Sequence, residues 1–286
     1  MHKTKPQPFL KWAGGKRRLA HDILSMFPSR IDTYFEPFLG GGAVFFALAQ
    51  QKCFQRAVLG DINVDLIKTY RAVRDDLASL IRALEDHAPF AKSPEYYYAL
   101  RSLDPKDLNP IARAARFIFL NKTCFNGLYR VNKAGRFNVA FGRYKHPDVV
   151  NADTLRQAFE ALQGVTLVTT DFADAIETTG PDDVVYLDPP YVPVSATASF
   201  TAYTSKDFGP GDHQRLLTAY RRCADAGTTT VLSNADVPKT RQLYAGEVIK
   251  TVRAARSINR DASKRGPVGE LLVTPTPREA LEVPRV

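Results

Sequence analysis

The chain has 286 residues and a net charge of +9, with 44% hydrophobic and 24% charged residues, which is typical of a globular protein of one large or two smaller domains. No apolar run approaches the ~20 residues that span a membrane, and the first residues lack the apolar core of a secretory signal. The chain has three scattered cysteines, Cys53, Cys124 and Cys223. They exclude a cysteine-rich zinc site and are typical of a reducing compartment, so we expect a cytoplasmic protein.

Short apolar, β-rich runs alternate with segments of helical periodicity along most of the chain. Strands are predicted at 33–37, 56–61, 166–171, 183–188, 228–234 and 269–274. The clearest helices are predicted at 41–51, 65–87 and 212–227. This alternation predicts an α/β fold with a mostly parallel sheet that is covered by helices on both faces.

The alternation stops between about residues 63 and 150, where the sequence predicts helices and basic loops without a buried strand. Such a segment is too long for a loop of a compact sheet. We expect an inserted, mainly helical subdomain at 63–150 within a discontinuous domain formed by 1–62 and 151–286. Within 111–150, eight Lys or Arg and one acid alternate with seven aromatic residues. This pattern favours contact with nucleic acid, although a solvated basic face over an aromatic core would have the same composition.

The segment "FEPFLGGGAVFF" at 35–46 places three glycines between a predicted strand and a predicted helix. Glycines permit a sharp turn and let a ligand approach the start of the helix. Asp61 follows Gly42 by 19 residues, at the end of the next predicted strand. This spacing is typical of an acid that binds the ribose hydroxyls of a nucleotide-like cofactor. Phe45 stands where the dinucleotide motif has its third glycine. The segment therefore favours a cofactor with one adenosine, with a plain glycine turn as the alternative.

The segment "FLKWAGGKRRL" at 9–19 places Trp12 and Lys16 just before a predicted helix. Lys16 at such a turn could meet a carboxylate or a phosphate. The alternative is a basic helix start with a half-buried tryptophan.

The segment "VVYLDPPY" ends a buried strand on an acid that is followed by two prolines and a tyrosine. The prolines restrict the backbone around Asp188, and Tyr191 offers a flat face beside its carboxylate. A rigid acceptor next to an aromatic face suits a planar substrate with an amino group, such as adenine or cytosine. The alternative is a strand-ending turn with an aspartate cap. Because Asp61, Asp171 and Asp188 all end predicted strands, we expect them along one crevice at the carboxyl edge of the sheet.

Four blocks occur in one order along the chain: "FLKWAGGK", "FEPFLGGG" with "DIN", "NKTCFNGLYRVNKAGRFNVAFGRYK", and "DPPY" with "SATASFTAYT". On these blocks, residues 9–273 resemble the Dam-type (alpha-group) site-specific DNA adenine-N6 methyltransferases. The resemblance implies a Rossmann-like methyltransferase sheet that uses S-adenosylmethionine (SAM) as methyl donor and needs no metal. It also implies that the inserted subdomain recognises a target in double-stranded DNA.

The resemblance assigns cofactor contacts to residues of the glycine loop and of the strand ends: Trp12, Lys16, Phe38, Gly40, Asp61, Asp171, Phe172 and Asp188. Trp12 and Lys16 would lie at the methionine end of SAM, with Lys16 near its carboxylate. Asp61 would hold the ribose hydroxyls. Asp171 and Phe172 would border the adenine ring of the cofactor.

The same resemblance places the chemistry on Asp188, Pro189, Pro190 and Tyr191. The target adenine would leave the duplex, because its amino nitrogen is out of reach inside the base stack. The Asp188 carboxylate and the Pro189 carbonyl would accept hydrogen bonds from that amino group, and Tyr191 would stack on the ring. The nitrogen would then attack the methyl group in line. Positioning of two bound reactants can supply roughly 7–11 kcal/mol.

DNA contacts implied by the resemblance lie in the basic block: Lys122, Phe125, Asn126, Leu128, Arg130, Arg143, Tyr144 and Lys145. Asn126, Leu128 and Arg130 would read bases, and the expected target is GATC. Phe125 stands where many relatives have tyrosine and could wedge into the base stack. Ala140 falls where relatives often have proline. The phosphate contacts would be Lys122, Arg143, Tyr144 and Lys145.

Three alternatives stay open at the level of sequence. One is SAM-dependent methylation of another amino group, on an RNA base or a protein glutamine. The others are a non-catalytic nucleic-acid-binding module and a nicotinamide oxidoreductase, which the missing third glycine disfavours. We further expect a monomer in solution, with pairing on DNA as an alternative.

Overall fold

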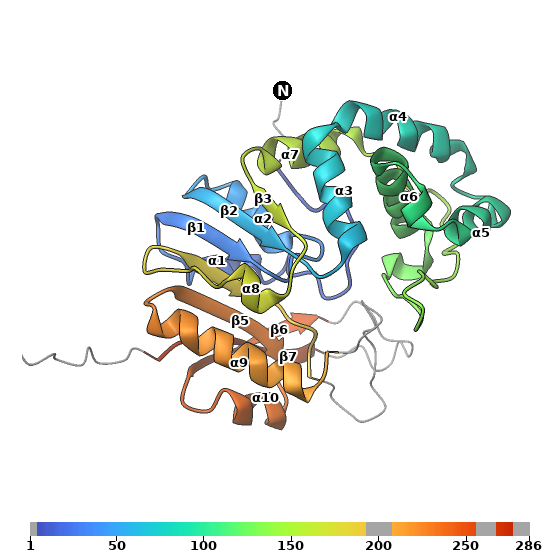
Figure 1. The fold of residues 1–286 in the computed structure, drawn as a ribbon. Coiled ribbons are helices and arrows are strands. Elements are labelled where there is room, and N and C mark those ends of the chain that lie inside the picture. The colour runs from blue at the N-terminus through green and yellow to red at the C-terminus, as the bar shows by residue number, and fades with distance from the viewer. Residues whose placement is uncertain (1–4, 193–207, 256–266, 277–286) are drawn as a thin grey trace, which may run out of the picture.

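A computed structural model describes residues 5–192, 208–255 and 267–276 (Figure 1). The predicted block "SATASFTAYT", residues 195–204, lies outside the described residues.

One seven-stranded sheet organises the described chain, in the order β3-β2-β1-β4-β5-β7-β6. Strands β1 to β5 pair in parallel, whereas β7 pairs antiparallel with β5 and with β6. The strands are β1 (Ile31–Glu36), β2 (Phe54–Gly60), β3 (Thr166–Val168), β4 (Val184–Leu187), β5 (Thr229–Ala235), β6 (Val248–Ala255) and β7 (Pro267–Thr274). The six predicted strands are confirmed, and β6 was not predicted.

Helices cover both faces of the sheet, as Figure 1 shows. They are α1 (Ala20–Leu24), α2 (Ala43–Ala49), α3 (Val64–Asp75), α4 (Leu77–His87), α5 (Pro94–Ser102), α6 (Pro110–Thr123), α7 (Ala152–Leu162), α8 (Phe172–Ala175), α9 (Pro210–Asp225) and α10 (Pro238–Leu243). Among the described helices, none is long and apolar enough to cross a membrane.

Two hydrophobic cores lie on opposite sides of the sheet because successive strand residues point to opposite faces. Tyr186 packs in the core with α1, α2, α3 and α7, whereas its neighbours Val185 and Leu187 pack in the core with α8 and α9. All four residues of β4 are buried, as expected for a central strand of a parallel sheet. The predicted α/β class, with helices on both faces, is confirmed.

The predicted helix at 65–87 was wrong in one respect, because α3 and α4 are separate helices. Asp76 breaks the run with an extended φ of −147°, and its side chain accepts a hydrogen bond from the backbone N–H of Ser79. Aspartate favours such a cap over a helix interior. The apolar periodicity continues on both sides of Asp76, so the sequence pattern alone did not reveal the turn.

The segment between β2 and β3 consists of helices and loops, with only the isolated bridges Cys124–Phe141 and Val131–Phe137 between its residues. Helices α4, α5 and α6 lie to one side of the sheet in Figure 1, and α3 lies between them and β3. Residues of this segment and of the sheet share one continuous hydrophobic core. The domain boundaries at 63 and 150 therefore stay a prediction.

A clasp of two hydrogen bonds ties the N-terminal segment to the helical segment. The Lys11 N–H donates to Asn121 Oδ1 at 2.8 Å, and Asn121 Nδ2 donates back to the Lys11 carbonyl at 2.7 Å. The next residue, Trp12, stacks on Tyr129 with ring centroids 5.5 Å apart. The N-terminal segment thus bridges the sheet and the helices of the inserted segment.

Glu36 is a buried acid at the carboxyl end of β1, with 2% of its surface exposed. Its Oε2 accepts hydrogen bonds from the Tyr34 hydroxyl at 2.8 Å and from the Phe45 N–H at 3.1 Å. Burial nevertheless raises the pKa of Glu36 from 4.5 to about 8. The folded protein therefore binds a proton here more tightly than the unfolded chain does.

We predict that Glu36→Gln removes a pH-dependent part of the stability. The stability that protonated Glu36 contributes to the wild type is fully present below pH 4.5 and is lost as the pH rises toward about 8. Within this window, the free energy of unfolding of the wild type relative to the variant should fall by about 1.4 kcal/mol per pH unit. Urea denaturation of both proteins at pH 5.5, 7 and 8.5 measures this difference, with Glu85→Gln on the exposed side of α4 as the control. A difference that is constant with pH would contradict the prediction.

Candidate active site

The candidate site, called the crevice below, is the carboxyl edge of the sheet at the point where the chain reverses its direction of winding. From β1 the chain proceeds to β2 and β3 on one side, and from β4 to β5 on the other. Ligands of open α/β sheets bind beyond the carboxyl ends of the strands at such a point. The glycine loop 38–42 follows β1 and Asp188 follows β4, so the two sequence motifs meet here.

Asp61 holds the glycine loop in place. Its Oδ2 accepts a hydrogen bond from the Gly40 N–H at 3.0 Å, and its Oδ1 accepts one from the Asn63 N–H at 2.9 Å. Burial raises the pKa of Asp61 to about 6, against the lowering effect of these two hydrogen bonds. Asp61 as a residue is partly exposed, and each carboxylate oxygen has lone-pair capacity for a further hydrogen bond.

Trp12 packs directly on the glycine loop. A Cβ atom at Gly40 would lie 2.7 Å from the indole Nε1, and one at Gly41 would lie 2.9 Å from Trp12 Cβ. Gly40 also has a φ of +48°, which disfavours any other residue. The glycines of this loop are therefore required by close packing as well as by the turn.

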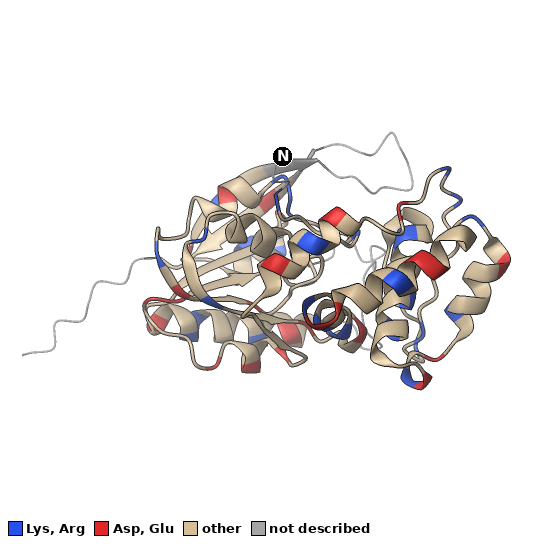
Figure 2. Ribbon diagram, turned by 90° about the horizontal axis from the view of Figure 1, so that it is seen from above, with Lys and Arg blue, Asp and Glu red and all other residues tan. Residues whose placement is uncertain are grey.

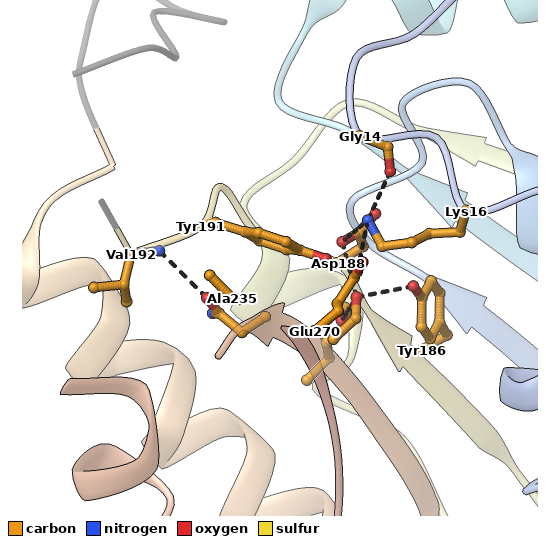
Figure 3. Close-up of polar contacts among 11 residues, drawn as sticks. Gly14, Lys16, Tyr186, Asp188, Tyr191, Val192, Ala235 and Glu270 are labelled. Carbon is orange, nitrogen blue, oxygen red and sulfur yellow. Dashed lines mark hydrogen bonds and ion pairs between the residues drawn. The ribbon is translucent and has the colours of Figure 1, made fainter. Parts of the chain in front are cut away.

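Asp188 is anchored on one oxygen. Its Oδ1 lies 2.9 Å from Lys16 Nζ and accepts a hydrogen bond from Ser233 Oγ at 2.8 Å (Figure 3). Ser233 in turn lies 2.9 Å from the Tyr186 hydroxyl. Both contacts use Oδ1, so the anchoring does not occupy Oδ2.

Lys16 is buried among acceptors. Besides Asp188, its Nζ donates to the Gly14 carbonyl at 2.7 Å and lies 3.4 Å from Glu270 Oε1. Burial alone would lower the pKa of Lys16, but Asp188 and Glu270 outweigh it and raise the pKa. The sequence placed Lys16 near a carboxylate. The structure brings it to two carboxylates of the protein itself, and its contact with the cofactor stays a prediction.

Tyr191 faces this charged group from the other side (Figure 3). Its hydroxyl donates a hydrogen bond to Glu270 Oε1, and Lys16 Nζ lies 4.8 Å from the centroid of its ring. The backbone N–H of Val192 donates to Asn234 Oδ1 at 3.3 Å. Pro189 is buried and Pro190 is partly buried, so the whole motif is held against the sheet.

Three aromatic rings pack together at the start of the glycine loop. Phe38 stacks on Phe172 with centroids 5.3 Å apart, and Phe208 meets both rings at 5.9–6.0 Å. Asp171 caps α8 through the Ala173 N–H and pairs with Arg215 at 2.8 Å. The ion pair with Arg215 was not predicted.

The predicted DNA-contacting residues of 125–145 are brought together by backbone hydrogen bonds. The Phe125 N–H donates to the Ala140 carbonyl at 2.8 Å, and the Gly142 N–H donates to the Thr123 carbonyl at 2.8 Å. These contacts place the segment after α6 beside the segment that carries Arg143, Tyr144 and Lys145. Phe125 is 54% exposed, as a side chain that enters a base stack would need to be.

Other side chains of this block differ in their availability. Arg130 is exposed, and its Nε donates to Asn138 Oδ1 at 2.8 Å. Asn126 is exposed in a left-handed conformation with a φ of 54°, while Leu128 is partly buried. The ring of Tyr144 lies under Lys11 Nζ at 3.9 Å. Burial lowers the pKa of Lys122, which is partly buried.

Two of the eight cations counted in 111–150 belong to the interior. Arg116 is 5% exposed and donates to the carbonyls of Leu100 and Arg101, while Arg113 pairs with Asp65. Figure 2 shows Lys and Arg interspersed with Asp and Glu over the helices and loops of the protein. The cations that are exposed follow α6: Arg130, Lys133, Arg136, Arg143 and Lys145.

Sequence reasoning missed two polar residues that contact the group around Asp188, namely Ser233 and Glu270, and it gave no role to Glu36, which is buried at the end of β1. None belongs to a spacing pattern that indicates a ligand, and their proximity follows from the order of the strands. In the part of the chain that the structure describes, no cluster of three or more His, Cys, Asp or Glu side chains could hold a metal ion.

The strand order, the glycine loop and the acid after β4 define a Rossmann-like methyltransferase domain. A family model described as "D12 class N6 adenine-specific DNA methyltransferase" matches residues 12–258. The chain belongs to this family, so the predicted family is confirmed.

Three relatives cover nearly the whole chain. Type II methyltransferase M.MjaIII of Methanocaldococcus jannaschii is 41% identical over 274 residues, which cover 91% of this chain and 95% of the relative. Type II methyltransferase M1.LlaDCHI of Lactococcus lactis subsp. cremoris is 38% identical over 279 residues and 96% of both chains. The DNA adenine methylase of Escherichia coli K12 is 36% identical over 269 residues, which cover 94% of this chain and 95% of the relative.

The protein is therefore an adenine-specific DNA methyltransferase, and DNA is its substrate. Family membership favours this activity over the oxidoreductase, the non-catalytic module and the methylation of RNA or protein.

We predict that Gly40→Ala destabilises the protein more than the replacement by alanine of another glycine that also has a positive φ. Gly164→Ala is the matched control, because Gly164 has a φ of +74° and nothing within 4 Å of an added Cβ. Each variant should lose about 1–2 kcal/mol from its left-handed backbone. Gly40→Ala should lose more by urea denaturation, and its emission should shift because Trp12 is the only tryptophan. Equal losses with unchanged emission would refute the packing role of Trp12.

Proposed function

We propose that this enzyme transfers a methyl group from SAM to the 6-amino group of an adenine that is flipped out of double-stranded DNA, within GATC. The observation that carries the proposal is the position of Asp188. It follows the central strand β4 next to the glycine loop of β1, with one oxygen anchored and an aromatic ring beside it.

The crevice suits a ligand with an adenosine and an amino acid end. Phe38 and Phe172 offer aromatic surface at one end, and Asp61 offers acceptors for ribose hydroxyls. Trp12 packs on the glycine loop, and Lys16 contacts Asp188. When bound, SAM supplies an electrophilic methyl group on a positively charged sulfur.

The chain's own residues would orient the amino group. Asp188 Oδ2 and the Pro189 carbonyl would accept its two N–H bonds and favour a more tetrahedral nitrogen. Tyr191 would stack on the base and exclude water from one face. Because Lys16 and Ser233 fix Oδ1, the second oxygen of Asp188, Oδ2, is held in a constant position. Such positioning, without a covalent enzyme intermediate, would provide much of the acceleration.

The proposed DNA surface combines residues 122–130 with residues 143–145. Phe125 is exposed enough to fill the space that a flipped base leaves. Arg130 contacts Asn138 through Nε, so this hydrogen bond does not use the two terminal nitrogens of the guanidinium. These nitrogens could bind the edge of a guanine. We retain the proposals that the recognition subdomain comprises 63–150 and that the enzyme is a monomer in solution.

We predict that Asp188→Ala lowers the rate of methyl transfer by about 10³-fold, in the range expected for loss of a catalytic group. The variant should still bind duplex DNA. Transfer of labelled methyl from SAM to a GATC duplex measures the rate, and a gel-shift titration measures binding. Asp182→Ala is the control, because this exposed acid precedes the same strand at its opposite end. A near wild-type rate for Asp188→Ala would overturn the proposal.

We predict different outcomes for Arg130→Ala and Lys145→Ala. Loss of a bidentate guanine contact should relax target choice by about 1–3 kcal/mol at one position. Loss of a phosphate contact should weaken binding to all sequences and lower its salt dependence. Sequencing of the adenines modified in a plasmid, with binding at several salt concentrations, separates the two. An equal loss on cognate and non-cognate DNA in Arg130→Ala would argue against base reading.

A further inference from the structure

Glu270 brings an additional carboxylate into the crevice from the antiparallel strand β7. It lies opposite Ala235 of β5 and Val252 of β6 in the sheet. Only 8% of its surface is exposed. Ionised side chains are rarely buried to this extent unless they are paired, so its partners indicate what it does.

Both described partners of Glu270 belong to the crevice. Its Oε1 accepts the hydrogen bond of the Tyr191 hydroxyl and lies 3.4 Å from Lys16 Nζ (Figure 3). Lys16 in turn contacts Asp188 at 2.9 Å. One oxygen thus links the aromatic ring to the cation that anchors the proposed acceptor.

The tip of Tyr191 needs such a partner. The two prolines restrict the backbone that leads to it, and Asn234 fixes the backbone of Val192 that follows. Neither contact limits rotation of the tyrosine side chain itself. The hydrogen bond to Glu270 holds the hydroxyl end, so the long axis of the ring is fixed at both ends.

We propose that Glu270 is a positioning residue for methyl transfer, which fixes the Tyr191 ring and holds Lys16 against Asp188. This inference rests on the proposed roles of Tyr191 and Asp188. Glu270 itself touches neither the base nor the methyl donor in this arrangement. Its effect is exerted through geometry, because small misplacements of reacting groups are costly.

The charge of the group is consistent with this role. Lys16 carries one positive charge, and Asp188 and Glu270 carry two negative charges when ionised. The resulting excess of negative charge suits a donor whose sulfur is positive. Burial raises the pKa of Glu270, while Lys16 and the Tyr191 hydroxyl oppose that rise.

The test compares three variants in single-turnover methylation of a GATC duplex. Glu270→Ala and Tyr191→Phe both remove the hydrogen bond to the ring, so each should slow transfer by about tenfold. Glu270→Gln keeps an acceptor oxygen and should stay within about threefold of wild type. The double variant Glu270→Ala/Tyr191→Phe should be no slower than the slower single variant, because both act on one contact.

A second measurement separates positioning from a structural role. With 2-aminopurine at the target position, the ring of Tyr191 should quench the extruded base in the wild type and in Glu270→Gln. Glu270→Ala should lose that quenching while the KM for DNA changes little. Glu247→Ala is the control, because Glu247 is a mostly buried acid that pairs with Arg221 outside the crevice.

Two outcomes would overturn the inference. One is Glu270→Ala at the wild-type rate. The other is Glu270→Gln as slow as Glu270→Ala, with quenching unchanged and equal losses of thermal stability. Failure of the proposed function is distinct, because the wild type itself would then transfer no methyl from SAM to the duplex, and the inference would fall with it.

Discussion

The buried ammonium of Lys16 joins parts of the chain that are far apart in sequence. It contacts the Gly14 carbonyl, Asp188 after β4 and Glu270 on β7. A buried charge without partners costs several kcal/mol, so each contact stabilises the others. The crevice can therefore form only when the turn at Gly14, strand β4 and strand β7 are all in place. Fold and site geometry depend on the same ion group.

The parallel part of the fold could be predicted because short β-rich runs alternate with helical segments, and because the central strand β4 is buried throughout and reads as one apolar run. Strand β6 could not, since Lys250 and Arg253 interrupt its apolar residues at the edge of the sheet. The antiparallel pairing of β7 is also invisible locally. It depends on which strand the chain returns to, and this is a long-range property.

Site residues that belong to a sequence motif could be predicted. Site residues that reach the crevice only through the order of the strands could not. Asp61 and Asp188 end strands and precede turns, so their positions in the crevice follow from the sequence. Glu270 is a single acid within an apolar strand, and it reaches the crevice because β7 lies beside β5. Composition also overstated the basic surface, because it does not reveal that Arg116 points into the interior of the helical segment.

The clasp between Lys11 and Asn121 has a consequence for motion. Its two hydrogen bonds and the stack of Trp12 on Tyr129 join the N-terminal segment to the helical segment, while Trp12 also packs on the glycine loop. A hinge that opened the helices away from the sheet would have to break these contacts. If a flipped base enters the crevice as proposed, we expect side chains and loops to accommodate it, rather than rotation of two lobes about a free linker.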